Sequence, residues 1–237
     1  VLTFAAAPDY ETKTSYTATV TATDGTNSTT QSVTINVTNV NDNSPVFASP
    51  ATLSVAENQT SIGTVTATDG DASDSVTFTV SGSELSITSA GVLTFASAPD
   101  YETKTSYTAT VTATDGTNST TQSITVNVTD VDDVAPAFSS SATFSAAENQ
   151  TAIGTVAATD ADTSDSSISF TVSGSELSIT SAGVLTFASA PDYETKTSYT
   201  ATVTATDGAN SGTQSITVNV TNLNDNSPAF TSSATFS

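Results

Sequence analysis

Most acidic residues of this chain fall into short sequence blocks that recur along it. Of the 24 acidic residues, 20 lie in blocks that read A-E-N, T-D-x-D, D-Y-E or A-T-D-G, or in junction stretches, the first being Asn39-Val40-Asn41-Asp42-Asn43. Calcium takes several hard oxygen ligands from carboxylates, amide side chains and backbone carbonyls. On an extended chain every second side chain points the same way, so an Asp-x-Asp spacing directs two carboxylates toward one ion. The blocks therefore predict bound Ca²⁺.

The blocks also have a plainer interpretation. Asp and Asn favour turns for conformational reasons alone, and acidic side chains keep a surface soluble. Charges that served only solubility would be spread more evenly, whereas only Asp74, Glu84, Asp165 and Glu176 lie outside the blocks. Glu84 and Glu176, each in a G-S-E-L segment, are interpreted as solvated charges that discourage pairing at strand edges. For the blocks themselves, calcium binding is the interpretation that the pattern favours.

Composition excludes several kinds of partner and chemistry. The 237 residues include 3 Lys and Arg but 24 Asp and Glu, a formal net charge of −21, so we expect no binding to nucleic acid. The absence of Cys and His removes thiolate chemistry, Cys-type zinc sites and the commonest general base. We therefore predict no catalytic residue, no enzyme activity and no cofactor other than Ca²⁺.

The chain also lacks the segments that direct a protein into a membrane. No apolar run approaches the roughly 20 residues of a membrane span, and no signal peptide opens the chain. We expect a soluble internal part of a longer protein, without direct membrane insertion.

The sequence repeats itself with a period of about 90 residues. The segment Gly91–Thr129 recurs as Gly183–Thr221 with two differences. Such a period suits an independent β-sandwich and is too long for a solenoid unit. We predict the C-terminal part of a repeat at 1–44, whole repeats at 45–135 and 136–227, and the start of a further repeat at 228–237.

Apolar residues alternate with Thr, Ser and Asn within each repeat. In the first whole repeat the alternation runs through Val76, Phe78 and Val80, and again along residues 124–128. A period of two is the signature of strands with one buried and one solvent-exposed face. About seven such strands per repeat, separated by Gly, Asp, Asn and Pro turns, predict an all-β fold of tandem seven-stranded Greek-key β-sandwiches. Helix content near zero is expected.

The part at 1–44 contains only the last strands of a sandwich. Its apolar residues are therefore expected to lack half of their core. They are Leu2, Phe4, Tyr16, Val20 and Ile35.

The ordered set A-E-N, T-D-A-D, P-D-Y-E, A-T-D-G and N-x-N-D-N-S-P resembles the calcium motifs of the cadherin family in order and spacing. The resemblance implies cadherin- or immunoglobulin-like sandwiches joined end to end by calcium-binding linkers. In that family, ions lie between successive domains, held by the Glu and D-x-E blocks of one domain, the linker, and the D-x-D and D-x-G blocks of the next. For the joint between the whole repeats the implied ligands are Glu57, Asp100, Glu102, the carbonyls of Val131 and Val134, Asp132, Asp133, Asp160, Asp162 and Asp207.

The same correspondence implies ligands at the other joints. They are Asp9, Glu11, Asn41, Asp42, Asn43, Asp69, Asp71 and Asp115 at the first, and Glu148, Asp192, Glu194 and Asp225 at the last. The linker Asp132-Asp133-Val134 departs from the family's Asn-Asp-Asn by adding negative charge. Because the chain has no Trp, the Trp-anchored strand exchange of classical vertebrate cadherins is not implied. Near-identical Thr- and Ser-rich repeats without Cys are more similar to cadherin-like modules of giant bacterial surface adhesins.

The near-identity of the repeats favours a structural role, because a spacer needs copies rather than distinct surfaces. We expect an extracellular or cell-surface adhesion protein in which calcium makes the joints rigid, so that the repeats act as an extender. The alternative is a directly adhesive module that binds other copies of itself or surface glycans, although the absence of Trp counts against sugar stacking. The expected partners are calcium ions and the neighbouring repeats of the same chain.

Overall fold

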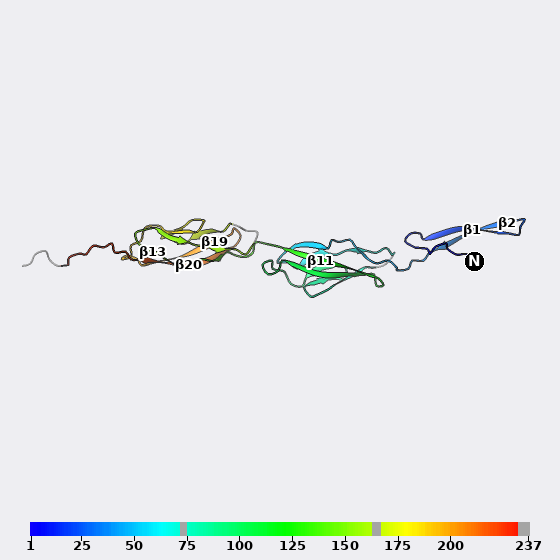
Figure 1. The fold of residues 1–237 in the computed structure, drawn as a ribbon, viewed down its shortest axis with the longest axis horizontal. Coiled ribbons are helices and arrows are strands. Elements are labelled where there is room, and N and C mark those ends of the chain that lie inside the picture. The colour runs from blue at the N-terminus through cyan, green and yellow to red at the C-terminus, as the bar shows by residue number, and fades with distance from the viewer. Residues whose placement is uncertain (72–74, 163–166, 232–237) are drawn as a thin grey trace, which may run out of the picture. The chain divides into compact units, whose positions relative to one another are not determined.

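The computed structural model describes residues 1–71, 75–162 and 167–231, and all regular structure among them is β-strand (Figure 1). The chain divides into two compact units, Val1–Thr129 and a second that starts at Asp130. The predicted all-β fold is confirmed for the described residues. None of these residues forms a helix long and apolar enough to cross a bilayer. The limits predicted for the individual repeats stay predictions, and the last six residues of the part at 228–237 lie outside the described residues.

The first unit begins with a hairpin of two long strands. β1 (Ser15–Thr23) and β2 (Ser28–Asn36) pair antiparallel along their full length. Asp24 shapes the turn between them, because its Oδ1 accepts hydrogen bonds from the amides of Thr26 and Asn27. These bonds replace ladder bonds that the turn residues cannot make.

The apolar residues around this hairpin are poorly covered, as expected. Leu2 is 55% exposed, Phe4 39% and Val20 46%. Tyr16 and Ile35 are half-buried, and the rings of Phe4 and Tyr16 meet edge to face with centroids 5.1 Å apart. The prediction that this part lacks core partners is confirmed among the described residues.

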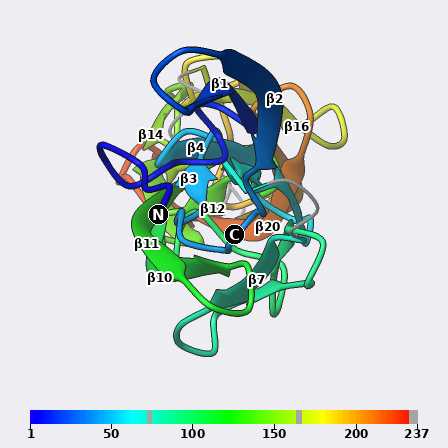
Figure 2. The ribbon, with the colours of Figure 1, turned by 90° about the vertical axis from the view of Figure 1, so that its right-hand side faces the viewer.

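Residues 45–129 form a β-sandwich of two layers. One layer is a sheet with the order β4-β11-β10-β7, in which β11 pairs parallel with β4 and antiparallel with β10, its neighbour in Figure 2. The other layer consists of β3-β6 and β5-β9-β8, which are hydrogen-bonded as separate sheets. Because only short breaks separate β3 from β4 and β5 from β6, the nine segments make seven strands, which confirms the predicted Greek-key sandwich. The segments are β3 Val46–Phe47, β4 Thr52–Ala56, β5 Ser61–Thr64, β6 Ala67–Thr68, β7 Thr77–Val80, β8 Leu85–Ile87, β9 Val92–Phe95, β10 Ser106–Thr114 and β11 Ser119–Thr129.

The core of this repeat lies between the two layers and follows the period of two. Along β11, Ile124, Val126 and Val128 are buried, whereas the residues between them are partly exposed. Leu93 and Val111 have no exposed surface and join the same cluster. Each buried aliphatic side chain of this kind stabilises the fold by about 1.5–3 kcal/mol.

The second unit has the same architecture, with sheets β13-β20-β19-β16, β14-β18-β17 and β12-β15. Gly183 illustrates how closely its chain segments approach, because it has a φ of +85° and a Cβ there would lie 2.2 Å from the carbonyl oxygen of Val156. Only glycine fits this place. The segments are β12 Ala137–Phe138, β13 Thr143–Ala147, β14 Ala152–Thr155, β15 Ala158–Thr159, β16 Ser169–Val172, β17 Leu177–Ile179, β18 Val184–Phe187, β19 Ser198–Thr206 and β20 Ser211–Thr221.

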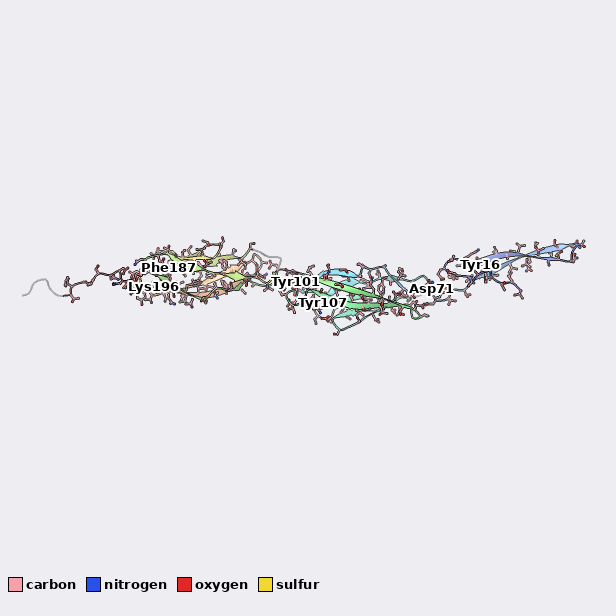
Figure 3. The ribbon with its side chains drawn as sticks, viewed as in Figure 1. Tyr16, Asp71, Tyr101, Tyr107, Phe187 and Lys196 are labelled. Atoms are coloured by element: carbon pink, nitrogen blue, oxygen red, sulfur yellow. The ribbon has the colours of Figure 1, made fainter. Side chains whose placement is uncertain are left out.

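The lysine of each whole repeat lies on the outside of the sandwich against an aromatic ring. Lys196 forms an ion pair with Glu176, and its Nζ lies 4.4 Å from the centroid of the Tyr199 ring. Tyr199 in turn packs edge to face on Phe187, and Phe187 and Lys196 can be located in Figure 3. The G-S-E-L glutamates are thus exposed, as predicted, but each one pairs with a lysine that sequence reasoning had not assigned to it.

Candidate metal centres

Asp71 lies at the base of the first linker, residues 39–43, and holds it. The residue is only 4% exposed. Its Oδ2 accepts hydrogen bonds from the amides of Asp42 at 3.1 Å and Asn43 at 2.8 Å, and its Oδ1 accepts one from the Asn43 side chain at 3.1 Å. Burial tends to raise the pKa of Asp71, but the hydrogen bonds from Asn43 and Asp42 outweigh burial and hold the pKa below its ordinary value. The carboxylate is therefore ionised at neutral pH.

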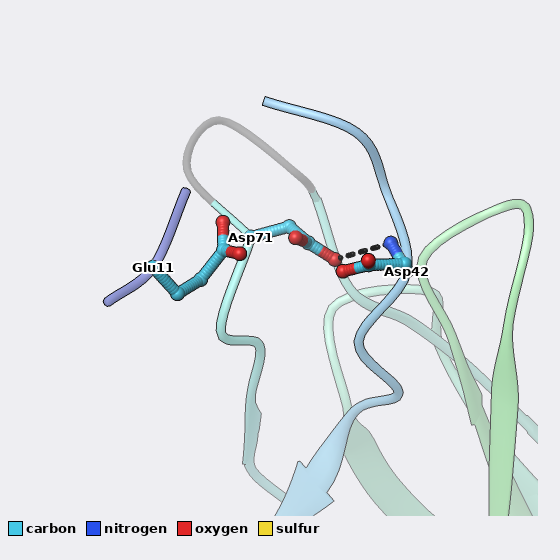
Figure 4. Close-up of side chains that lie close together, drawn as sticks. All are labelled: Glu11, Asp42 and Asp71. Atoms are coloured by element: carbon cyan, nitrogen blue, oxygen red, sulfur yellow. Dashed lines mark hydrogen bonds between the residues drawn. The ribbon is translucent and has the colours of Figure 1, made fainter. Parts of the chain in front are cut away.

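Glu11, Asp42 and Asp71 bring three carboxylates together beside this linker (Figure 4). One oxygen from each lies within 4.8 Å of the others. The pKa of Glu11 is raised, first by burial and then by the negative charges of Asp71 and Asp42. At about 5 Å two unit charges repel by roughly 0.8 kcal/mol even in water. A divalent cation at this place would replace that repulsion by attraction.

The first aspartate of each T-D-x-D block has one oxygen directed to the protein and one without a partner. Asp69 Oδ1 accepts a hydrogen bond from the Asp71 amide at 2.9 Å, and Asp160 Oδ1 accepts one from the Asp162 amide at 3.0 Å. Oδ2 of both Asp69 and Asp160 is buried without a hydrogen-bond partner. An unsatisfied buried charged group is costly, whereas calcium accepts such oxygens as ligands. These residues therefore fit a calcium ion.

Asn118 connects the A-T-D-G block to the first linker, and sequence reasoning missed it. Asp115 Oδ1 accepts hydrogen bonds from the amides of Thr117 and Asn118, both at 2.6 Å. The Asn118 side chain then donates to Asn41 Oδ1 at 2.6 Å and to the carbonyl oxygen of Asn43 at 2.8 Å. The recurrence of Asn three positions after the aspartate, in D-G-T-N and D-G-A-N, was the available signal.

The second linker, residues 130–134, meets its own repeat in a similar way. Asp162 Oδ2 accepts hydrogen bonds from the amides of Asp133 at 3.1 Å and Val134 at 2.9 Å. Asn210 donates from its side chain to Asp132, at 2.8 Å to Oδ1 and 3.2 Å to the backbone oxygen. Asp162 is 4% exposed. The D-x-D block thus binds linker amides in both units.

The A-E-N glutamates are buried at the opposite ends of the sandwiches. Glu57 is 4% exposed and Glu148 only 2%. Glu57 Oε2 accepts a hydrogen bond from the Tyr101 amide at 2.6 Å. In Glu148, Oε2 accepts one from the Tyr193 amide and Oε1 one from the Leu223 amide, both at 2.7 Å. These bonds compensate the burial of the carboxylates.

The Asn of each A-E-N block explains how the glutamate is directed inward. Asn58 and Asn149 both have a φ of 63°, a left-handed conformation that Asn tolerates better than most residues. Their amides donate to the carbonyl oxygens of Pro99 and Pro191, each at 3.0 Å. The turn thereby joins the A-E-N block to the P-D-Y-E block.

The D-Y-E blocks complete two further acidic groups. Glu57, Asp100 and Glu102 place ligand oxygens within 4.8 Å of one another, and Glu148, Asp192 and Glu194 do the same. Asp192 shapes its own turn, because its carboxylate accepts hydrogen bonds from the Thr195 hydroxyl and the Glu194 amide. These hydrogen bonds lower the pKa of Asp192, although burial opposes this. Asp9 and Asp100 accept hydrogen bonds in the same kind of turn.

The structure thus brings nine of the predicted ligands into three acidic groups, each of which lies within one unit. Asp225 is different, because its Oδ2 accepts a hydrogen bond from the Asn149 side chain at 2.5 Å instead of joining the Glu148 group. The side chain of Val131 is 38% exposed, which suits a residue predicted to contribute only its carbonyl. That these residues bind calcium stays a prediction.

The fold and these groups define tandem Greek-key sandwiches with acidic clusters at their ends. Residues 142–221 match the family model of the cadherin domain, and the fold resembles that of tandem cadherin repeats. The sequence resemblance to cadherins is thereby confirmed, whereas the closer resemblance to bacterial adhesins stays a prediction.

Known proteins are similar to this chain over its repeats. Human Protocadherin Fat 4 is 38% identical over 120 residues, which are 45% of this chain and 2% of that protein. The structure of Protocadherin gammaB7 EC3-6, described as a cis-dimer, is 29% identical with a TM-score of 0.70, covering 92% of this chain and 60% of that chain. Mouse Cadherin-23 EC22-24 shares the fold with a TM-score of 0.69 at 24% identity, covering 91% and 77%. The chain spans only a few per cent of the full length of the curated relatives.

Proposed function

We propose that the chain is a calcium-dependent structural extender of an extracellular cell-adhesion protein, in which Ca²⁺ makes the joints between repeats rigid. The observation that carries this proposal is the set of buried carboxylate oxygens without a partner beside the linkers, in Asp69, Asp160, Asp162 and Asp207. Each is ionisable, and leaving it unsatisfied costs about 1–3 kcal/mol or more. Calcium bound at the linkers removes this cost.

The proposed ligands come from the acidic blocks that the sequence assigns to the joints. At the first joint, Glu11, Asp42 and Asp71 form one side of the site, with Asp69 and Asp115 on the next repeat. At the joint between the whole repeats, the group of Glu57, Asp100 and Glu102 serves the end of one sandwich, and Asp132–Val134, Asp160, Asp162 and Asp207 serve the start of the next. Calcium supplies the positive charge that lets these carboxylates approach.

A spacer role fits the chemistry that the chain contains. It has no Cys or His, and its acidic groups are those proposed for calcium, so we propose no catalytic activity. Association with other copies of the chain is the second candidate, because a similar protein, Protocadherin gammaB7, has been described as a cis-dimer. Binding to glycans stays a prediction from the sequence.

The variant Asp133→Ala tests the extender, because this residue occupies the centre of the second linker. Small-angle scattering of the full chain in millimolar calcium should give a longer and stiffer particle for the parent than for Asp133→Ala. The two should converge when a chelator is added. The matched control Glu176→Ala also removes one negative charge, but from an exposed lysine pair, and should behave like the parent. Identical, calcium-independent profiles for parent and Asp133→Ala would refute the proposal.

A further inference from the structure

The two linkers differ in sequence although they contact the same types of residue. Three of five positions change between the first linker, Asn39–Asn43, and the second, Asp130–Val134. Asn39 becomes Asp130, Asn41 becomes Asp132, and Asn43 becomes Val134. On the repeat that follows each linker, the D-x-D aspartates, the D-G aspartate and the Asn after it are the same, whereas Gly70 is replaced by Ala161 and Thr117 by Ala209. The hydrogen-bond donors that the two linkers offer to these shared residues therefore differ.

Asn43 donates a hydrogen bond to a D-x-D carboxylate, and Val134 at the equivalent position cannot. In the first unit both oxygens of Asp71 accept hydrogen bonds from the linker, Oδ2 from two amides and Oδ1 from the Asn43 side chain. In the second unit Asp162 Oδ2 likewise accepts two linker amides, but Oδ1 is buried without a hydrogen-bond partner. The valine side chain has no hydrogen-bond donor, so Val134 leaves Oδ1 of Asp162 unsatisfied. Asp162 is only 4% exposed.

The Asn of the D-G-x-N segment shows a second difference of the same kind. The Asn118 side chain donates to Asn41 Oδ1 and the Asn43 carbonyl, and lies 3.4 Å from Asp115 Oδ2. The Asn210 side chain donates to Asp132, and Oδ2 of Asp207 is buried without a hydrogen-bond partner. Asp207 is 8% exposed. Both unsatisfied oxygens flank the second linker, since Asp162 binds its amides and Asp207 holds Asn210.

We infer that the two linkers depend on calcium to different degrees: the second linker needs a cation in order to stay docked on its repeat, whereas the first stays docked without one. At the first linker, the side-chain amides of Asn43 and Asn118 donate hydrogen bonds to oxygens that a cation would otherwise bind. At the second linker, Asp162 Oδ1 and Asp207 Oδ2 bind the hard divalent cation instead of an amide donor. Asp130 and Asp132 add negative charge to the same linker. This inference rests on the proposed function, because it takes calcium as the cation.

Amide hydrogen exchange of the full chain, followed by NMR, tests the inference at both linkers at once. The reporters are the backbone amides that donate hydrogen bonds to the D-x-D carboxylates. Exchange at Asp42 and Asn43 is compared with exchange at Asp133 and Val134. In chelator we expect protection at the first linker to exceed that at the second by about tenfold or more, the effect of one unsatisfied charged group. Calcium should raise protection at the second linker much more than at the first.

Exchanging Asn43 and Val134 between the linkers tests whether these side chains cause the difference in amide protection. Asn43→Val should lower protection of the first linker in chelator to the level of the second, and Val134→Asn should raise the second toward the first. Val184→Asn is the matched control, because it adds the same amide at an exposed position of the second unit and should change neither.

Each outcome has a distinct meaning. Equal protection of both linkers in chelator, with an equal rise in calcium, would overturn the inference and leave the proposed function standing. A Val134→Asn variant with the calcium dependence of the parent would also overturn it. No response of either linker to calcium would instead overturn the proposed function, and with it the cation assigned to the second linker.

Discussion

Replacing Glu148 by alanine should destabilise the second repeat, and more so in calcium than in chelator. Glu148 is 2% exposed and accepts hydrogen bonds from the amides of Tyr193 and Leu223, both at 2.7 Å. A hydrogen bond to a charged group contributes about 1.5–3 kcal/mol, so losing two costs about 3–6 kcal/mol. The oxygens of Asp192 and Glu194 lie within 4.8 Å, and removing their repulsion with Glu148 returns about 2 kcal/mol in water.

The net loss in chelator is therefore about 1–4 kcal/mol, and in calcium the offset disappears because the ion neutralises the repulsion. Native-state exchange of core amides in β19 and β20 measures this loss, at about tenfold in protection per 1.4 kcal/mol. Glu176→Ala in the same repeat is the control, because an exposed ion pair contributes about 1 kcal/mol at most. The reasoning is refuted if Glu148→Ala costs no more than this control, or costs the same with and without calcium.

Three further perturbations follow from local geometry. Asn149→Val should destabilise the second repeat by about 1–2 kcal/mol more than Asn149→Gly because Asn149 has a φ of 63°, and equal costs for the two variants would speak against left-handed strain. Gly183→Ala should lower the melting temperature of that repeat, because the new Cβ would lie 2.2 Å from the Val156 carbonyl oxygen; an unchanged calorimetric transition would contradict this. The amides of Asn27 and Thr26 lower the pKa of Asp24 in the folded state. The ionised Asp24 therefore stabilises the fold above its unfolded pKa, and this stabilisation is lost as pH falls through the folded pKa. An NMR titration of the Asn27 amide should inflect below the ordinary aspartate pKa of about 3.9, and an inflection above it would oppose the assignment.

The strand architecture could be predicted because it depends on local periodicity. Residues 124–128 alternate between buried and exposed in the sequence as they do in β11. The acidic groups could be predicted in part for a similar reason, since Asp-x-Asp and D-Y-E spacings set which side chains share one side of a short segment. Both are properties of a few consecutive residues.

The contacts that hold the linkers could not be predicted in this way. Asn118 lies 77 positions from Asn41, and only the folded sandwich brings the D-G-T-N turn beside the linker. The pairing of Lys104 with Glu84, 20 positions apart, likewise depends on how the turns meet across the sandwich. The departure at Val134 was visible in the sequence, but its consequence for Asp162 depends on the hydrogen bond that Asn43 makes at the equivalent place.

The central claim is that this chain binds calcium through its linkers. Calorimetric titration of the full chain with CaCl₂, after dialysis against chelator, tests it most directly. We predict saturable binding of more than one ion per chain, with Kd on the order of 10⁻⁴–10⁻³ M as in extracellular calcium modules, and weaker binding in Asp162→Asn. Heats indistinguishable from dilution, for the parent as for Asp162→Asn, would contradict it.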